Sequence, residues 1–323
     1  MEKAMLIKEN MDKYQLEGIS YIGIDRVVIG IPFNQLDQMD GSIFPGEKLK
    51  EANTQIHYIQ DTLTEIFGIS GKPLKGIPLL KRYHLKSEEG SGNLIGSIMV
   101  GRNPNGLPVL NFEFNPSKIS QGDWQEYEVA LSLLLFNHYE ELYLHGVVSH
   151  FEFFLDLEQY LPDDLVLISL ARRSHSQYKN TQYRGRRGSK LVGTIYDKSG
   201  QLKQSCTRTR IEVRLNRRDM LFRDLVGSNI PNPLKNFLVV SSDALKTIST
   251  EWKMPDLGNK IKNFGLFEGV SNRYARAAIK QRLQELVVSF WKPDELWETY
   301  KTMLSEFRPD FIGGFDKQLA PLH

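Results

Sequence analysis

Cysteine is almost missing from this chain of 323 residues, in which Cys206 is the single example. One cysteine excludes an internal disulfide framework and any metal site built from several thiolates, and it is typical of a reducing cytoplasm. Long apolar runs are missing as well, since none reaches the roughly 18 residues that a membrane helix requires. The N-terminal residues also lack the apolar segment of a secretory signal peptide. We therefore expect a cytoplasmic protein that makes no contact with a membrane.

Two ligand-binding patterns are also missing. The string Glu89-Gly90-Ser91-Gly92 is not followed by the Lys-Ser/Thr of a Walker loop, so the sequence does not indicate ATP use. No His-hydrophobe-His pair occurs, and His145 and His150 are five residues apart, which puts them on opposite faces of a strand. A metal site in this chain must therefore consist mainly of carboxylates.

Acidic residues are scarce in one segment. Between Leu165 and Arg218 the chain has 14 lysines and arginines and only two acids, whereas the net charge of the whole chain is +2. Such clustering concentrates positive potential on one part of the molecule and attracts polyanions such as nucleic acids. With 41% hydrophobic and 25% charged residues, the chain otherwise has the composition of a globular protein.

Alternating and β-branched segments predict strands, and apolar residues at helical spacing predict helices. The expected strands cover 21–33, 97–100, 109–114, 147–157, 166–172, 191–196 and 207–215. The expected helices cover 46–67, 123–143, 233–250, 272–291 and 293–306. This order predicts an α+β fold, in which an antiparallel sheet is backed by helices and the C-terminal region is helical.

Two pairs of these strands resemble each other weakly in sequence, which we call the internal echo. The segments 110–115 and 210–215 each have a central glutamate, and the strands 21–31 and 147–157 lie a comparable distance upstream of them. Two related halves would explain the echo. Chance is the alternative explanation, because alternating strands resemble one another.

Two strands carry polar side chains on one face, because residues two apart on a strand point the same way. The face of 147–157 has His150, Glu152 and Asp156, and the face of 207–215 has Arg208, Arg210, Glu212 and Arg214. If the strands are neighbours, their carboxylates share one surface. Such hard oxygen ligands suit Mg²⁺ or Mn²⁺, and an imidazole favours Mn²⁺. The alternative is that the acids pair with the arginines of the other strand.

Tyr183 lies inside the basic segment, next to a glycine turn. A phenol is a weak nucleophile at neutral pH because its pKa is about 10, so it needs a metal ion or cationic surroundings that stabilise phenolate. Arg184, Arg186 and Arg187 supply positive charge. Attack on a phosphodiester would form a 5′-phosphotyrosine and release a 3′-hydroxyl, while Lys198 and Arg187 neutralise charge in the transition state. A tyrosine in a basic loop is also typical of base stacking or of simple packing.

Two other tyrosines and a set of basic residues complete the candidates. Tyr178 is a rival nucleophile, but it lacks the Gly-x-Arg-x-Ser context that follows Tyr183. Tyr196 is expected to pack or to contact DNA. The basic residues expected to bind nucleic acid are Arg172, Arg173, Arg184, Arg186, Lys190, Arg210 and Arg214.

Residues 181–198 match the pattern T-x-Y-x-G-x-R-x-S-(x)5-I-Y-D-K. This segment resembles the tyrosine motif of the replication initiators of Gram-positive rolling-circle plasmids and the related relaxases of conjugative transposons. Two further blocks agree in order, because 149–156 resembles the family's acidic strand, R-[LI]-D-x-A-x-D, and 210–215 resembles its R-x-E-x-R strand. More loosely, 111–119 and the helix after it are similar to gene II initiators of filamentous phages.

The resemblance implies a site-specific, metal-dependent endonuclease that nicks and rejoins single DNA strands to initiate rolling-circle replication or mobilisation of a plasmid, phage or transposon. Its nucleophile would be Tyr183, and its Mg²⁺ or Mn²⁺ ligands would come from Glu152, Asp156 and Glu212, with His150 as an addition. A nicking-joining nuclease domain of the nuclease-relaxase type would cover 1–228, with 1–120 and 121–228 as its two candidate halves. A mostly helical region over 229–323 would bind duplex DNA or a partner.

The partner that the resemblance implies is DNA, both the single-stranded nick site and the flanking duplex, and a host helicase and a second copy of the chain are further candidates. Four positions depart from the family pattern. His150 stands where the family usually has Arg, Glu152 replaces Asp, and Gly193-Thr194 replace a bulkier residue and an Arg. These departures leave the full ligand set open.

Two other hypotheses compete with the endonuclease. One is a non-catalytic DNA-binding repressor or replication-control protein on the same fold. The other is an RNA-binding sheet protein whose Tyr178, Tyr183 and Tyr196 stack on bases.

Overall fold

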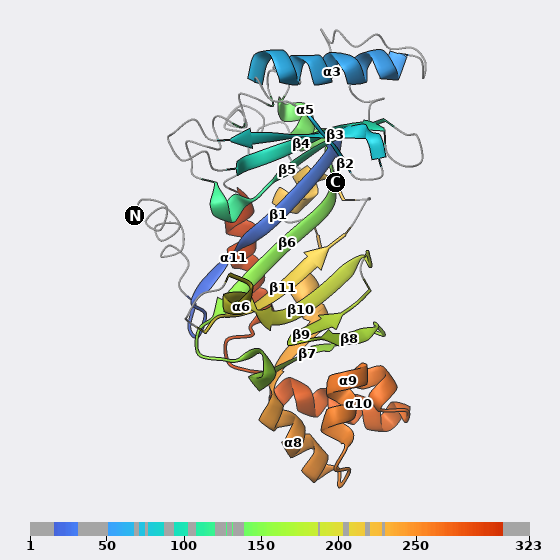
Figure 1. The fold of residues 1–323 in the computed structure, drawn as a ribbon. Coiled ribbons are helices and arrows are strands. Elements are labelled where there is room, and N and C mark those ends of the chain that lie inside the picture. Colours follow the sequence, from blue (N-terminus) through green and yellow to red (C-terminus); the bar gives the residue numbers. More distant parts are fainter. Residues whose placement is uncertain are drawn as a thin grey trace, which may run out of the picture. The chain divides into compact units, whose positions relative to one another are not determined.

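The chain divides into two compact units in the computed structural model (Figure 1). Unit 1 consists of Met1–Ile24, Glu152–Asn216 and Pro231–Tyr300, and unit 2 consists of Asp25–Phe151, Arg217–Ile230 and Lys301–His323. The structure describes residues 16–31, 51–67, 71–74, 77–86, 94–102, 108–119, 127, 131, 139–186, 188–202, 207–216, 220–227 and 230–305. These units follow other bounds than the expected regions 1–228 and 229–323, which stay a prediction.

Backbone hydrogen bonds join ten strands in the order β2-β3-β4-β5-β1-β6-β11-β10-β9-β8, and β7 and β12 form a second, two-stranded sheet. The strands are β1 Tyr21–Ile31, β2 Lys72–Leu74, β3 Ile77–Lys86, β4 Leu94–Arg102, β5 Pro108–Phe114, β6 Val147–Leu157, β7 Leu165–Ser169, β8 His175–Tyr178, β9 Thr181–Arg184, β10 Leu191–Asp197, β11 Thr209–Leu215 and β12 Phe237–Ser241. The α-helices are α3 Glu51–Phe67, α5 Tyr139–His145, α6 Lys198–Leu202, α7 Phe222–Val226, α8 Ser242–Glu251, α9 Leu257–Gly269, α10 Arg273–Glu285 and α11 Pro293–Ser305. Single 3-10 turns cover Pro116–Lys118, Pro162–Asp164 and Pro233–Asn236. The neighbouring strands run antiparallel wherever their register is defined. The expected α+β fold, with an antiparallel sheet and a helical C-terminal region, is confirmed.

The two-stranded sheet of unit 1 comes from two continuous apolar runs. β7 is buried along its whole length, and β12 pairs with it from Phe237 opposite Ser169 to Ser241 opposite Leu165. A run of this kind fits a strand that is covered on both faces. The expected helix over 233–250 is therefore wrong in its first half, because Phe237-Leu-Val-Val forms β12 and the helix α8 begins only at Ser242.

Three helices cover the two-stranded sheet. The side chain of Ser241 accepts a hydrogen bond from the backbone of Ala244 at the start of α8, and Asn272 caps α10 in the same way. Apolar residues of α8, α9 and α10 then bury themselves against β7 and β12, among them Ile248, Ile261 and Leu283. This packing gives unit 1 a core of its own.

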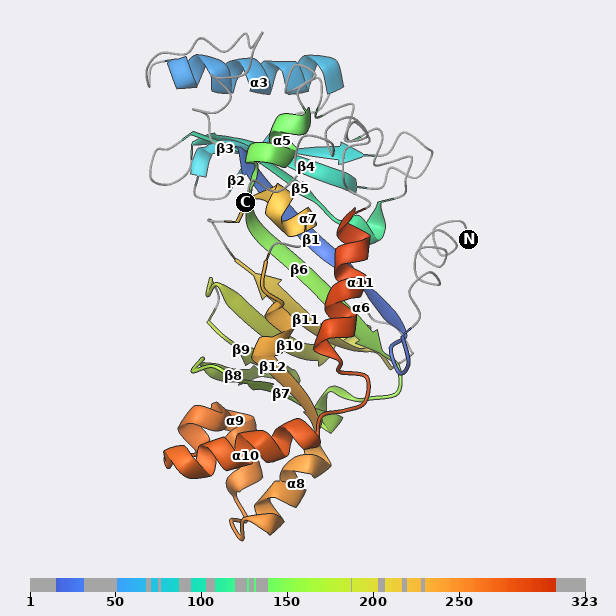
Figure 2. The same ribbon diagram turned by 180° about the vertical axis from the view of Figure 1, so that it is seen from behind.

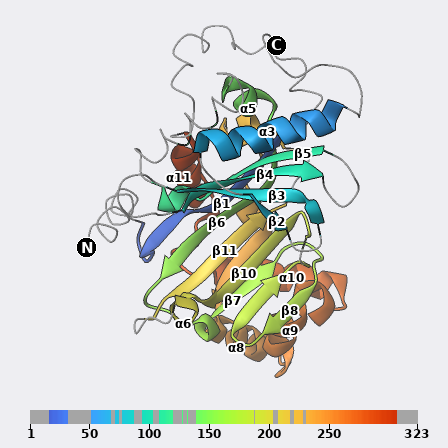
Figure 3. The same ribbon diagram turned by 45° about the horizontal axis from the view of Figure 1, so that its top comes forward.

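Helix α11 lies along one face of β6 in unit 1, as seen from behind in Figure 2. The Phe153 ring lies 5.8 Å from the Trp297 ring and 4.8 Å from the Tyr300 ring, measured between centroids. The Tyr300 hydroxyl donates a hydrogen bond to the backbone oxygen of Phe154 at 2.7 Å. The odd-numbered face of β6 is thus covered. Its even-numbered face is the one that carries the predicted polar residues, and Figure 3 draws no described helix in front of β6, β11 and β10.

Unit 2 holds the strands β2 to β5 and the part of β1 from Asp25 onwards. The expected strands over 97–100 and 109–114 lie within β4 and β5, which pair from Gly96 opposite Phe114 to Arg102 opposite Pro108. At the centre of β5, Glu113 binds Arg26 at 2.9 Å and Arg82 at 3.4 Å. The expected helix over 123–143 lies mostly outside the described residues. No helix in the described ranges is long and apolar enough to cross a membrane.

Candidate active site

The predicted nucleophile and one predicted metal ligand belong to one row of residues across three strands. Thr194 on β10 is the register partner of Tyr183 on β9 and also of Glu212 on β11. Register partners on neighbouring strands project to the same face, with Cβ atoms about 5 Å apart. Tyr183, Thr194 and Glu212 therefore share one face of unit 1, and Tyr183 is half-buried there.

Glu152 on β6 and Glu212 on β11 are both buried, with 7% and 6% of their surface exposed. Arg214 holds the two carboxylates together. Its Nη2 donates to Glu212 Oε1 at 2.9 Å, and its Nε contacts Glu152 Oε1. Burial alone would lower the pKa of Arg214, but the two carboxylates outweigh it and raise this pKa.

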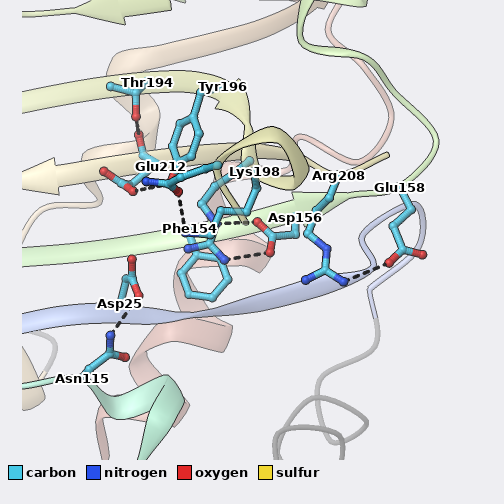
Figure 4. A network of polar contacts seen from close by, with 12 residues as sticks. Asp25, Asn115, Phe154, Asp156, Glu158, Thr194, Tyr196, Lys198, Arg208 and Glu212 are labelled. Atoms are coloured by element: carbon cyan, nitrogen blue, oxygen red, sulfur yellow. Dashed lines mark hydrogen bonds and ion pairs between the residues drawn. The ribbon is translucent and has the colours of Figure 1, made fainter. Parts of the chain in front are cut away.

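Glu152 and Glu212 are the acids of unit 1 that could hold a metal ion, since one oxygen of each lies within 4.8 Å of the other. An all-oxygen donor set of this kind fits a hard divalent cation such as Mg²⁺ or Mn²⁺. The Arg214 guanidinium already balances part of the charge of these two carboxylates. In unit 2, the Oδ1 of Asp25 on β1 accepts a hydrogen bond from Asn115 Nδ2 at 3.0 Å (Figure 4).

Two predicted ligands lie outside the carboxylate group of Glu152 and Glu212. Asp156 is 1% exposed and accepts two hydrogen bonds from Arg210, from Nε at 2.6 Å and from Nη2 at 2.8 Å. Arg210 also lies over the Phe154 ring, with its Cζ 3.6 Å from the ring centroid. Asp156 thus has a structural partner of the kind that the sequence allowed as the alternative. His150 is half-buried on β6 and is not a member of the carboxylate group either.

The turn that follows Tyr183 depends on glycine. Gly185 has φ +118°, and a Cβ there would lie 2.8 Å from the backbone oxygen of Leu191. The backbone N–H of Gly185 donates to Ser174 O at 2.8 Å, which extends the pairing of β8 and β9 at the open end of their hairpin. The Gly of the Tyr-x-Gly motif therefore lets the end of β9 lie against the start of β10.

Arg184, predicted to bind nucleic acid, is 1% exposed. Its guanidinium donates hydrogen bonds to the backbone oxygens of Leu167 at 2.5 Å, Tyr183 at 3.0 Å and Lys262 at 3.0 Å. Burial lowers the pKa of Arg184 to about 10. With these acceptors Arg184 ties the tyrosine strand to β7 and α9, which leaves it unable to reach DNA.

The other basic candidates differ in exposure. Arg172, Arg186 and Lys190 are exposed, as DNA contacts require. Arg173 is half-buried and donates to Leu191 O at 3.4 Å and to Asn236 Oδ1 at 3.5 Å. Lys198 donates to Gln201 Oε1 at 2.9 Å. Arg187 lies outside the described residues.

One contribution to this site was missed by sequence reasoning. It is the hydroxyl of Tyr196, which donates a hydrogen bond to Glu212 Oε2 at 3.1 Å. No pattern in the sequence identified that contact.

Comparisons with known proteins add little. A scan against protein-family models finds no match, and a search of the curated proteins finds none either. One similar solved structure is described as "Structure of Rolling Circle Replication Initiator Protein from Geobacillus stearothermophilus". The similarity covers 89% of this chain and 97% of that chain, with a TM-score of 0.36 and 10% sequence identity. At this TM-score we draw neither fold nor function from it.

Proposed function

We propose that the chain is a metal-dependent tyrosine endonuclease that nicks and rejoins single DNA strands, as rolling-circle initiators and relaxases do. The observation that carries the proposal is the row of Tyr183, Thr194 and Glu212 on one sheet face, with the buried carboxylate of Glu152 beside it. A phenol and a carboxylate group on one face are what a phosphodiester needs for attack and for charge neutralisation.

In this mechanism Glu152 and Glu212 would hold the cation, and Asp156 would not. When bound, a divalent cation polarises a non-bridging oxygen of the scissile phosphate. Tyr183 loses its phenolic proton to water, and its oxygen forms a bond to phosphorus. The bond from phosphorus to the 3′ oxygen breaks, and this oxygen takes up a proton from water. Lys198 and Arg187 are the proposed cations that offset the charge of the transition state.

The proposed partner is DNA, and the flanking duplex would extend toward the helices of unit 1. A cavity of about 780 Å³ at α8 and α9 is lined by three lysines, Lys246, Lys253 and Lys262, together with hydroxyl groups such as those of Ser242 and Thr250. Ammonium and hydroxyl groups around one hollow suit the phosphates of a DNA backbone. A helicase and a second copy of the chain remain proposed partners, and the cytoplasm is the proposed site of action.

The test is incubation of the full chain with supercoiled DNA of its own locus and Mn²⁺, followed by peptide mapping of any DNA-linked residue. We expect a 5′-linked adduct on Tyr183, which the Tyr183→Phe chain cannot form, while DNA binding survives. Tyr178→Phe is the matched control, because Tyr178 lies on the partner strand of the same hairpin and is 67% exposed. If the adduct maps to Tyr178, the nucleophile is misassigned.

A second candidate function has one observation in its favour. Arg214 already neutralises Glu152 and Glu212, as a protein without a metal ion would require. This would be a DNA-binding control protein on the same fold. Specific binding to the same DNA, with no cleavage in either Mg²⁺ or Mn²⁺, would establish this function instead.

A further inference from the structure

Tyr196 lies on the same sheet face as Tyr183. It follows Thr194 by two residues on β10, so both side chains project to one face. Thr194 is opposite Tyr183 on β9, which makes Tyr183 and Tyr196 diagonal neighbours. Diagonal neighbours on adjacent strands are about 7–8 Å apart, within reach of aromatic side chains. Both tyrosines are half-buried, so each keeps part of its ring accessible.

The Tyr196 hydroxyl already touches a carboxylate of the candidate active site. It donates a hydrogen bond to Glu212 Oε2 at 3.1 Å, and Figure 4 shows the two side chains together. This contact places the Tyr196 oxygen beside a carboxylate that would hold the cation. The Lys198 ammonium lies 5.9 Å from the centre of the Tyr196 ring.

The strand that carries Tyr196 is held firmly. The register partner of Tyr196 on β11 is Arg210, which donates two hydrogen bonds to Asp156. One residue further on, Asp197 Oδ1 accepts a hydrogen bond from Gly200 N at 2.9 Å as α6 begins. Rigid strands place reacting groups more accurately than loops do.

We propose that Tyr196 is a second DNA-accepting nucleophile, which lets one subunit perform two successive strand transfers. This rests on the proposed function, in which Tyr183 makes the first covalent bond. A chain whose first tyrosine is still joined to DNA needs another nucleophile to open a second phosphodiester without losing bond energy to water. Tyr196 meets that need from the neighbouring strand.

The bonds balance in this second transfer. Tyr196 loses its phenolic proton to water, and its oxygen bonds to the phosphorus of the new site. The bond to the 3′ oxygen breaks, and the leaving oxygen takes up a proton from water. The released 3′-hydroxyl then attacks the phosphorus held on Tyr183, whose phenolic oxygen leaves and regains a proton. One ester bond is exchanged for another at each step.

The test uses the full chain, Mn²⁺ and two nick-site oligonucleotides that carry different dyes. Each has a short piece on the 5′ side of the nick, which diffuses away with its new 3′-hydroxyl after cleavage, and carries its dye on the piece that stays linked through its 5′ phosphate, so that labelled adducts accumulate. We expect the parent chain to acquire both dyes, with adducts mapped to Tyr183 and Tyr196. Tyr196→Phe should retain one adduct, on Tyr183, and lose the second. Tyr183→Phe should form only the adduct on Tyr196, and the double Phe variant should form none.

The two proposals fail in different ways. If the parent chain forms no adduct on Tyr183, the proposed function fails. If the parent is fully loaded on Tyr183 but never acquires a second dye, or if Tyr196→Phe still acquires two, Tyr196 is not a nucleophile. A third result would overturn the proposal as well. If Tyr196→Phe binds Mn²⁺ more weakly and loses both adducts in parallel, Tyr196 only positions Glu212.

Discussion

The guanidinium of Arg210 donates two hydrogen bonds to the carboxylate of Asp156, at 2.6 and 2.8 Å. Both side chains are buried, and they join β11 to β6. Asp156 has an arginine of its own, whereas Glu152 and Glu212 share the single guanidinium of Arg214. This difference separates Asp156 from Glu152 and Glu212, although all three were candidate metal ligands.

Asp156→Ala should therefore unfold far more easily than the parent while its Mn²⁺ site keeps its ligands. Removing one member of a buried ion pair leaves the other uncompensated, at a cost of about 3–5 kcal/mol. Urea titration measures the free energy of unfolding. Asp243→Ala is the control, because its ion pair with Lys246 is exposed and its loss should change nothing measurable. Equal stability of Asp156→Ala and the parent would contradict this assignment.

Arg214→Gln should bind Mn²⁺ more tightly than the parent, because the guanidinium competes with a cation for Glu152 and Glu212. We expect a gain of about tenfold, or roughly 1.4 kcal/mol, in calorimetric titration without DNA. Arg208→Gln is the control, since Arg208 binds Glu158 at 3.6 Å and not the carboxylate group. Weaker Mn²⁺ binding by Arg214→Gln would mean that Arg214 helps to shape the site and does not compete for it.

Gly185→Ala should disrupt the tyrosine hairpin, whereas Gly188→Ala should have a mild effect. Both glycines have a positive φ, of +118° and +85°, so both substitutions carry backbone strain. Only at Gly185 would the new Cβ collide with backbone, since a Cβ at Gly188 has no atom within 4 Å. Adduct formation and unfolding in urea measure the contrast. A Gly185→Ala chain that forms adducts as fast as Gly188→Ala would show that the turn tolerates a side chain.

His175 should make the protein less stable as the pH falls. Burial, aided by the positive charge of Arg184, lowers the pKa of His175 to about 4. The unfolded chain takes up this proton near pH 6.5, so the free energy of unfolding should decrease between about pH 6.5 and pH 4. His175→Gln removes the titrating group and should flatten this part of the profile. Urea midpoints measured at several pH values check it, and an unchanged slope would rule out His175 as the cause.

Alternation in the sequence predicted the central strands well. β6 was predicted with its exact bounds, and the prediction for β10 was short by one residue. The polar edge strands β8 and β9 were missed because Ser176, Gln177 and Gln182 give no apolar pattern. β12 was taken for helix because a continuous apolar run has no period that tells strand from helix.

The site could be predicted only in part. Same-face reasoning placed Glu152 and Glu212 on one surface, on the condition that their strands are neighbours, since alternation alone decides which side chains of a strand share a face. The pairing of Asp156 with Arg210 depends on the register of β6 against β11, which no local pattern encodes.

The strands of the internal echo occupy corresponding places in the strand order. β5 pairs with β1 in unit 2, and β11 is the neighbour of β6 in unit 1. β5 and β11 each have a central glutamate that binds an arginine. Glu113 on β5 binds Arg26, and Glu212 on β11 binds Arg214. Duplication stays a prediction, but the repeated strands occupy matching places in the order.

Arg184 has a consequence for any attempt to isolate a smaller nuclease. A fragment that ends at residue 228 would lack Lys262, whose backbone oxygen accepts one of the Arg184 hydrogen bonds, and β12, the partner of β7. It would keep Tyr183 in its sequence, but the buried Arg184 guanidinium would lose one acceptor and the apolar strand β7 would lose its pairing partner. The tyrosine motif is thus inseparable from the helices that follow it, and shortened versions of this protein should be cut elsewhere.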